Sequence, residues 1–190
     1  FVTPLVVTAD GPPQLISPGA HWVVAYEPAT GKEIWRARHG NGFSIGSCPV
    51  FGHGMAFFSP GCMKPQLWAI RTDGAGDVTA THAAWKSMRQ VPVMSSPVLF
   101  GDELYWISDD GIANCADASS GELHWQERLN QQHLASPLLA EGRVHFFGKD
   151  GKSTVVRAGK QFEKLAENIL EGTVVATPAI LDQTIFLRTD

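Results

Sequence analysis

Five prolines recur in a repeated phrase, and their spacing constrains the fold more than any other feature of the chain. The phrase reads VTPLVV, SCPVF, SSPVLF, ASPLLA and ATPAIL, and the separations are 45, 48, 40 and 41 residues between Pro4, Pro49, Pro97, Pro137 and Pro178. After each of the last four copies come a turn and a second apolar run, as in GDELYWIS and EGRVHFFG. Such aromatic and β-branched runs favour strands. A period of about 40–48 residues built from them is typical of β-propeller blades, each with four antiparallel strands.

An eleven-residue phrase follows the second apolar run and completes the repeat. It reads AYEPATGKEIW at residues 25–35 and CADASSGELHW at residues 115–125. In a blade its two halves are the third and fourth strands, joined by a turn in which Gly31 and Gly121 accept a positive φ. Trp35 and Trp125 end the phrase, and we expect them to lie across the boundary to the next blade and to cover its glycine and peptide plane.

Two further copies of this phrase are altered. Residues 69–85 form a stretched copy that ends at Trp85 and contains the insertion RTDGAGDVTATH, which we interpret as a polar turn because it lacks the order of a calcium loop. In residues 155–165, Leu165 replaces the tryptophan. The full order therefore occurs four times and begins a fifth time. It predicts one domain over 1–190, with repeats at 1–44, 45–92, 93–132, 133–173 and 174–190, the last incomplete.

The repeat resembles the tryptophan-docking motif of pyrroloquinoline-quinone (PQQ)-like β-propellers. Residues 95–129, SSPVLFGDELYWISDDGIANCADASSGELHWQERL, are similar to that family over a whole blade, and FGHGMAFFSPG and LWAIRTDGAGDVTATHAAW resemble a bacterial subgroup common in planctomycetes. The resemblance implies an all-β fold, a partial β-propeller of four-stranded antiparallel blades. We expect about four blades plus two strands from the C-terminal part of a propeller with about seven or eight blades. Its open sheet edges would then make the isolated chain associate or aggregate.

Composition and charge narrow the partners. The chain has 190 residues, a net charge of −4 and a sequence pI of about 6.0, which favour neither a nucleic-acid backbone nor an anionic membrane surface. No apolar run approaches the ~20 residues of a membrane span. No leader is recognisable at Phe1. We therefore expect a protein or polysaccharide ligand and the remaining blades of the same propeller as partners, without nucleic acid and without a membrane span.

The resemblance leaves two classes of function open. The family includes quinoprotein alcohol dehydrogenases and the propeller lipoprotein of the outer-membrane β-barrel assembly machine. The enzymes use an Asp base, Ca²⁺ ligands, an Arg, a Trp platform and a vicinal Cys–Cys disulfide. This sequence has no Cys–Cys pair, and the repeat accounts for most of its tryptophans. We predict a non-catalytic binding or scaffold module without a cofactor, in the periplasm or at the cell surface. The alternative is an alcohol or sugar oxidoreductase that uses PQQ and Ca²⁺.

Candidate binding residues lie in the connections that follow each fourth strand. In a propeller these connections edge the central channel, and loops on a rigid scaffold commonly carry function. Their amides, aromatics and arginines suit a saccharide or a peptide, although solvated loops have the same composition. We predict no catalytic residue and no metal ligand. The candidates are Arg38, His39, Asn41, Phe43, Arg89, Gln90, Asn130, Gln132 and His133.

Other polar residues have structural explanations. Asp109 and Asp110 in SDDG suit a turn, and a carboxylate pair for acid–base chemistry is the weaker interpretation. His145 alternates along a strand and is expected to face a neighbouring sheet. Cys115 stands where the first copy has Ala25 and should be buried. Cys48 and Cys62 flank a hairpin, and whether they form a disulfide stays open.

Overall fold

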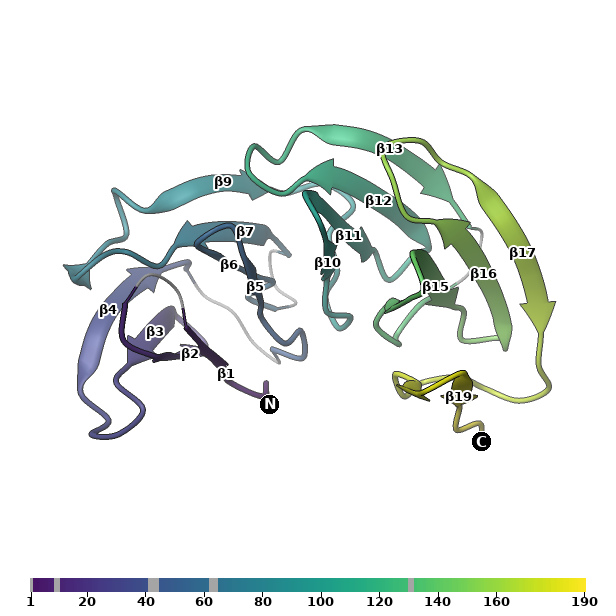
Figure 1. Cartoon of the computed structure of the whole chain (residues 1–190), viewed down its shortest axis with the longest axis horizontal. Helices are drawn as coiled ribbons and strands as arrows, with labels where there is room; N and C mark the ends of the chain where they lie inside the picture. The colour runs from purple at the N-terminus through teal and green to yellow at the C-terminus, as the bar shows by residue number, and fades with distance from the viewer. Residues whose placement is uncertain (1, 9–10, 41–44, 62–64, 130–131) are drawn as a thin grey trace.

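The computed structural model describes residues 2–8, 11–40, 45–61, 65–129 and 132–190. This described part is all-β, with five sheets that follow one another along the chain in an arc (Figure 1). In each sheet consecutive strands are antiparallel neighbours, with the first strand on the inner side of the arc and, in the first four sheets, the fourth on the outer rim. The expected partial propeller of four-stranded blades is confirmed.

The strands of each sheet follow one another along the chain. The first sheet contains β1 (Leu5–Val7), β2 (Gln14–Pro18), β3 (Trp22–Tyr26) and β4 (Glu33–Arg38). The second contains β5 (Val50–Gly52), β6 (Met55–Phe58), β7 (Leu67–Arg71) and β9 (Ala83–Ser87). The third contains β10 (Val98–Phe100), β11 (Glu103–Ile107), β12 (Ile112–Asp117) and β13 (Leu123–Arg128). The fourth contains β14 (Leu138–Ala140), β15 (Arg143–Phe147), β16 (Lys152–Arg157) and β17 (Lys164–Ile169), and the fifth has β18 (Ala179–Leu181) and β19 (Thr184–Phe186).

The hydrophobic core lies between neighbouring sheets. One cluster joins Trp35 of the first sheet to Trp68 and Ile70 of the second, and another joins Tyr105 of the third to Phe146 of the fourth. Both faces of the middle strands are therefore covered, which explains why β7 and β11 read as continuous apolar runs. A single sheet buries little by itself, so stacking of repeats supplies the stability.

The tryptophans at the ends of the repeated phrase reach the next sheet. Trp85 Nε1 donates a 2.8 Å hydrogen bond to the Ala118 carbonyl, and Trp125 Nε1 donates a 3.0 Å bond to the Gly159 carbonyl. Gly121 has φ 75°, and a Cβ at this position would lie 2.6 Å from the Trp85 ring. Both the backbone conformation and this close approach therefore require glycine in that turn.

The insertion in the second repeat differs from the polar turn expected from its sequence. Its strand β8 (Gly76–Asp77) crosses to the first sheet and pairs in parallel with β4, with Trp35 opposite Gly76. Val78 N also donates to the Arg36 carbonyl at 2.9 Å. Trp35 is thereby fully buried, and the insertion takes over the contact that a short turn makes in the following sheets.

The prediction that Leu165 replaces the tryptophan in the fourth sheet is wrong. Trp125 lies opposite Cys115 in its strand pair, whereas the residue opposite Val155, the matching position, is Ala166. The turn of the fourth sheet is one residue longer, as the bond from Arg157 N to the Glu163 carbonyl shows when compared with Asp117 N to Glu122. The small Ala166 side chain therefore stands where the other sheets have tryptophan.

The inner strands are joined by a row of hydrogen bonds from the residue that precedes each repeated proline. Cys48 N donates to Ser96 Oγ at 2.8 Å, Ser96 N to Ser136 Oγ at 2.9 Å, and Ser136 N to Thr177 Oγ1 at 2.9 Å. Each hydroxyl thus satisfies a backbone N–H of the preceding sheet at the inner edge of the arc.

Candidate functional site

One face of the arc, which we call the connection face, is built from two kinds of segment. These are the connections that join successive sheets and the turns that join the second strand of a sheet to its third. It comprises connections 88–97, 132–137 and 170–178 and turns 108–111 and 148–151. The Asp109 carbonyl accepts the His133 N–H at 3.0 Å, and Asp109 Oδ1 accepts the Val93 N–H at 3.0 Å. Each turn is therefore clamped by two successive connections, which makes the connection face a rigid support for side chains.

A shallow pocket of ≈ 270 Å³ opens on this face. Val91 and Val93 supply apolar surface, Met88 is 68% exposed, and Asp109 and Asp110 also line the pocket. The remaining lining residues are Pro65, Gln90 and Ser108. From the sequence, we interpreted the two aspartates as turn residues and kept a carboxylate pair for acid–base chemistry as the weaker interpretation. Neither interpretation included them among the binding candidates, although the paired carboxylates in SDDG were the available signal.

Of the predicted site residues, Gln90 lines this pocket and Arg89 is an exposed neighbour. Gln90 has φ 51°, and its carbonyl accepts hydrogen bonds from Trp106 Nε1 at 2.8 Å and Asn114 Nδ2 at 3.1 Å. Its backbone is thus fixed by the third sheet while its side chain remains exposed. Gln132 lies in the next connection, where its carbonyl accepts the Lys149 N–H at 2.7 Å.

The two predicted histidines are buried. His39 is 7% exposed, Nε2 lies 2.9 Å from the Gly19 carbonyl, and burial lowers its pKa. His133 is 1% exposed, neither ring nitrogen has a hydrogen-bond partner among the described residues, and burial lowers its pKa to about 4. Both side chains therefore lie behind the surface of the connections, and a direct role in ligand binding stays a prediction.

The remaining candidates are divided between the first sheet and parts of the chain outside the description. Arg38 is exposed at the end of β4, its guanidinium carbon lies 5.9 Å from the Trp22 ring centre, and its N–H donates to Thr79 Oγ1 at 2.9 Å. It belongs to a different sheet from the pocket. Asn41, Phe43, Asn130 and Cys62 lie outside the described residues.

The cysteines that the structure describes are free thiols. Cys115 is fully buried, as its position in the repeat predicted, and burial raises its pKa to about 12. A thiol with so high a pKa is a poor nucleophile at neutral pH. Cys48 is partly exposed and is likewise free, and Cys62 lies outside the described residues.

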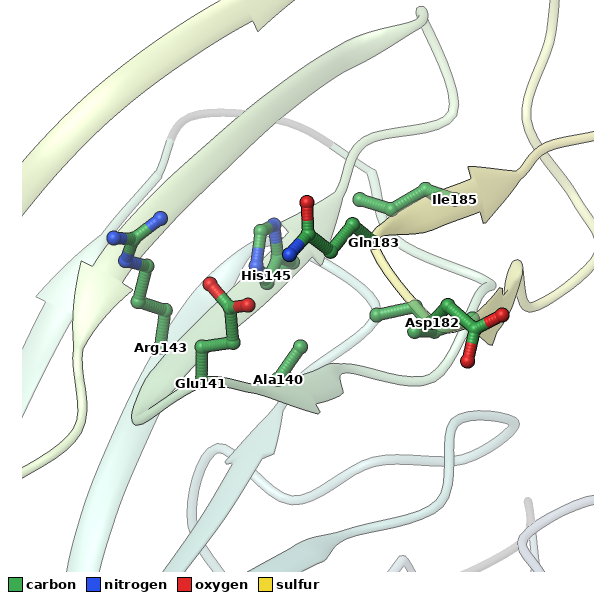
Figure 2. Close-up of a pocket in the computed structure, with 8 residues that line it drawn as sticks. Ala140, Glu141, Arg143, His145, Asp182, Gln183 and Ile185 are labelled. Atoms are coloured by element: carbon green, nitrogen blue, oxygen red, sulfur yellow. The ribbon is translucent and has the colours of Figure 1, made fainter.

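A second pocket, of ≈ 300 Å³, lies between the β14–β15 hairpin and the β18–β19 hairpin (Figure 2). The side chains of Glu141, His145 and Gln183 point toward one another, while the Asp182 carboxylate points away. Burial and the Arg143 charge lower the pKa of His145, so its imidazole is neutral at pH 7. His145 thus faces the neighbouring sheet, as its alternation along the strand predicted.

The cofactor alternative, PQQ with Ca²⁺, needs metal ligands and an aromatic platform. Within ranges 2–8, 11–40, 45–61, 65–129 and 132–190, no three His, Cys, Asp or Glu side chains are grouped so that they could hold a metal ion. Trp35 is buried in the cluster between the first and second sheets, and Trp85 and Trp125 each donate a hydrogen bond to the next sheet. In the same ranges no helix is long and apolar enough to cross a membrane.

Comparison with known structures gives the same fold at low identity. BamB from Moraxella catarrhalis aligns with a TM-score of 0.71 and 16% identity over 95% of this chain and 53% of that one. The computationally designed Ika8 protein aligns with a TM-score of 0.69 and 14% identity over 95% and 53%. A europium-containing methanol dehydrogenase aligns with a TM-score of 0.65 and 10% identity over 89% and 41%. The chain thus spans about half the length of these structures or less.

Sequence comparison identifies the family of the chain but no individual curated relative. A search of curated proteins found no match. The family described as outer membrane protein assembly factor BamB matches residues 19–175, most of the chain. That match covers three of the five repeated prolines, Pro49, Pro97 and Pro137, and the repeats between them. The chain belongs to this family of PQQ-like β-propellers.

Proposed function

We propose that this chain is part of a non-catalytic propeller that binds or scaffolds a protein or polymer ligand on its connection face. The observation that carries the proposal is the pocket beside Met88, where an exposed thioether and two valines adjoin the carboxylates of Asp109 and Asp110. The clamped turns and connections hold these groups in place without a ligand. Preorganised loops lose little conformational entropy on binding.

The chemistry of this pocket favours a protein ligand. An extended segment that alternates apolar residues with lysine or arginine would place its apolar side chains on Met88 and its cations near Asp110. Arg89 and Gln90 at the rim would add hydrogen bonds to the backbone of such a segment. A polysaccharide is the other polymer that could accept hydrogen bonds from Arg89 and Gln90. The remaining blades of the same propeller are the second kind of partner, and they would pair along the sheet edges.

The location that accompanies this function is the periplasm or the cell surface. Support comes from the family description, which names an outer membrane assembly factor, and from the BamB structure. The bacterial subgroup assigned from the sequence belongs to the same proposal. Secretion of a reporter fused to the natural N-terminal region of the protein would test this location directly.

Binding to two labelled peptides that differ only in charge tests the proposal. One alternates Lys and Leu, the other Glu and Leu, and fluorescence anisotropy measures the dissociation constant. We expect the Lys peptide alone to bind, with an affinity that falls as salt rises. Met88→Ser and Asp110→Asn should each weaken binding several-fold, whereas Glu122→Gln, an exposed change in another turn, should not. Equal binding of both peptides, or of all variants, would contradict a site at this pocket.

The alternative is a quinoprotein oxidoreductase, supported by the structural likeness to a methanol dehydrogenase. Titration with PQQ and Ca²⁺, followed by tryptophan fluorescence, distinguishes the two. Saturable, Ca²⁺-dependent quenching at micromolar PQQ would replace the proposed function with the oxidoreductase. An unchanged signal would leave PQQ-like as a description of the repeat.

A further inference from the structure

His133 puts a titratable side chain where the other repeats have an apolar one. It stands four residues before Pro137, and the residues at the same distance before the next prolines are Ile45, Val93 and Val174. The His133 ring is 1% exposed, and neither nitrogen has a hydrogen-bond partner among the described residues. A buried polar group without a partner costs free energy that an aliphatic side chain does not. Packing alone therefore does not explain a histidine at this position.

The backbone of His133 is part of the clamp that holds the ligand pocket of the connection face. Its N–H donates to the Asp109 carbonyl at 3.0 Å, and Asp109 Oδ1 accepts the Val93 N–H at 3.0 Å. On its other side His133 forms a β-bridge with Gly148. Val93 and Asp109 both line the pocket. A movement of connection 132–137 therefore acts directly on two residues of that pocket.

The surroundings of the His133 ring favour its neutral form. Hydrogen bonds join connection 132–137 to turns 108–111 and 148–151 and to connection 170–178. The charged residues of these three segments are Asp109, Asp110, Lys149, Asp150 and Glu171. The Asp150 charge raises the pKa of His133, as the Phe147 backbone does, but burial outweighs both and lowers this pKa to about 4.

Opening of the connection is therefore coupled to proton uptake. A His133 ring that leaves its buried position becomes hydrated and regains a pKa near 6.5. The open connection then binds the proton better than the closed one, so acid favours opening. With these two pKa values, the equilibrium constant for opening rises about tenfold from pH 7 to pH 5.5 and about twentyfold from pH 7 to pH 5.

We propose that His133 is an acid-triggered release for the ligand of the connection face. When the ring takes up a proton, connection 132–137 opens, the turn at Asp109 loses its clamp, and the pocket no longer holds its ligand. Bound ligand in turn keeps the connection closed and opposes proton uptake, because coupling between two binding events is reciprocal. This inference rests on the proposed function, since it describes how binding at that same pocket is regulated.

His145 provides a matched control. Burial also lowers the pKa of this histidine, so it responds to acid in the same direction. It lies in β15 opposite Leu138, as Tyr105 lies opposite Val98 one sheet earlier, and it does not line the ligand pocket. His145→Tyr therefore removes a comparable titration without altering the clamp at Asp109.

Amide hydrogen exchange in the full chain tests the opening. Protection factors, which exclude the intrinsic pH dependence of exchange, are measured for the amides of His133, Val93 and Lys149. We expect them to fall about tenfold from pH 7 to pH 5.5 and about twentyfold by pH 5, while the amides of β12 keep their protection. A parallel fall throughout β12 would show global unfolding and would overturn the proposal.

Variants at position 133 separate titration from polarity. His133→Val copies Val93, and His133→Gln keeps a polar side chain that does not titrate, so both should lose the acid response. His145→Tyr should keep it. Asp109 and Asp110 are present in every variant and so cannot account for a difference. An equal fall in protection in the parent and in His133→Gln would overturn the role of His133.

The Lys–Leu peptide distinguishes this inference from the proposed function. Saturating peptide should restore most of the protection lost at pH 5.5, and its dissociation constant should rise several-fold more from pH 7 to pH 5 in the parent than in His133→Gln. Binding at pH 7 with the same pH dependence in both proteins would overturn the release and leave the proposed function intact. Failure of the peptide to bind at pH 7 would overturn the proposed function, whereas an acid-dependent opening would still support the coupling at His133.

Discussion

The inner and outer ends of the sheets are closed in different ways. At the inner end the same bond joins three successive boundaries, from the N–H of the residue before each proline to the hydroxyl of the next such residue. At the outer end, the inserted strand β8 runs beside Trp35, a tight turn with Gly121 covers Trp85, and a longer turn with Phe162 covers Trp125. The inner bonds join main chain to a short side chain, so they tolerate little variation. The outer contacts are side-chain packing, for which several solutions have similar energy.

Removal of Trp35 should have the largest effect on the outer ends. Its side chain is fully buried, and Nε1 donates to Gln14 Oε1 at 2.8 Å. Trp35→Ala should lower the free energy of unfolding by about 3–5 kcal/mol. Trp85→Ala should cost less, because Trp85 is only partly buried. Urea unfolding followed by circular dichroism measures both, and an equal loss would show that the insertion adds nothing to the burial of Trp35.

His133 creates a pH-dependent weak point near the inner ends. It stands four residues before Pro137, where the other repeats have the apolar residues Ile45, Val93 and Val174. Burial lowers its pKa to about 4 from an unfolded value near 6.5, so the native state binds the proton less well. Stability is therefore complete above pH 6.5 and declines as the pH falls toward 4, by about 3 kcal/mol.

His133→Val, which copies Val93 and Val174, should remove this dependence. The variant should also be more stable at neutral pH, because two buried ring nitrogens without partners are gone. Unfolding free energies of both proteins between pH 7 and pH 4 make the test. Since His39 and His145 titrate in both proteins, only the difference between the two curves reports on His133. Parallel curves would contradict its assignment.

Two glycines with the same turn conformation differ in their surroundings. Gly31 and Gly121 have φ 73° and 75°, but a Cβ on Gly31 would meet nothing within 4 Å, whereas one on Gly121 would strike the Trp85 ring. Gly31→Ala should cost about 1 kcal/mol of strain, and Gly121→Ala about 2 kcal/mol or more. Thermal unfolding distinguishes them. A larger loss for Gly31→Ala would mean that turn strain, and not the packing of Trp85, controls this outer end.

The repeat made the fold predictable from the sequence. The departures from the repeat could not be predicted in this way. Local rules that act in the same way in each copy predicted the hairpin turns and the positive φ at Gly31 and Gly121. The spacing of the five prolines then gave the length of the repeat. The pairing of β8 with β4 is non-local and depends on which sheet the insertion meets, so RTDGAGD read only as a turn. A one-residue insertion moved Ala166 into the tryptophan position, which a sequence alignment without register does not reveal. Burial of His39 and His133 likewise depends on how connections fold over the sheets.

The smallest expected effect belongs to a single link of the inner row. Ser136→Ala removes the hydroxyl that accepts the Ser96 N–H, and leaves that donor without its partner at the inner edge. The expected loss is about 1 kcal/mol. Ser136→Thr keeps the hydroxyl, as Thr177 does naturally one sheet later, and is the matched control. If the inner row is a set of equivalent bonds, Thr177→Ala should cost a similar amount by its loss of the Ser136 N–H. A much larger loss at Ser136 than at Thr177 would instead show that the boundary between the third and fourth sheets depends on its inner hydrogen bond more than the boundary between the fourth and fifth sheets does.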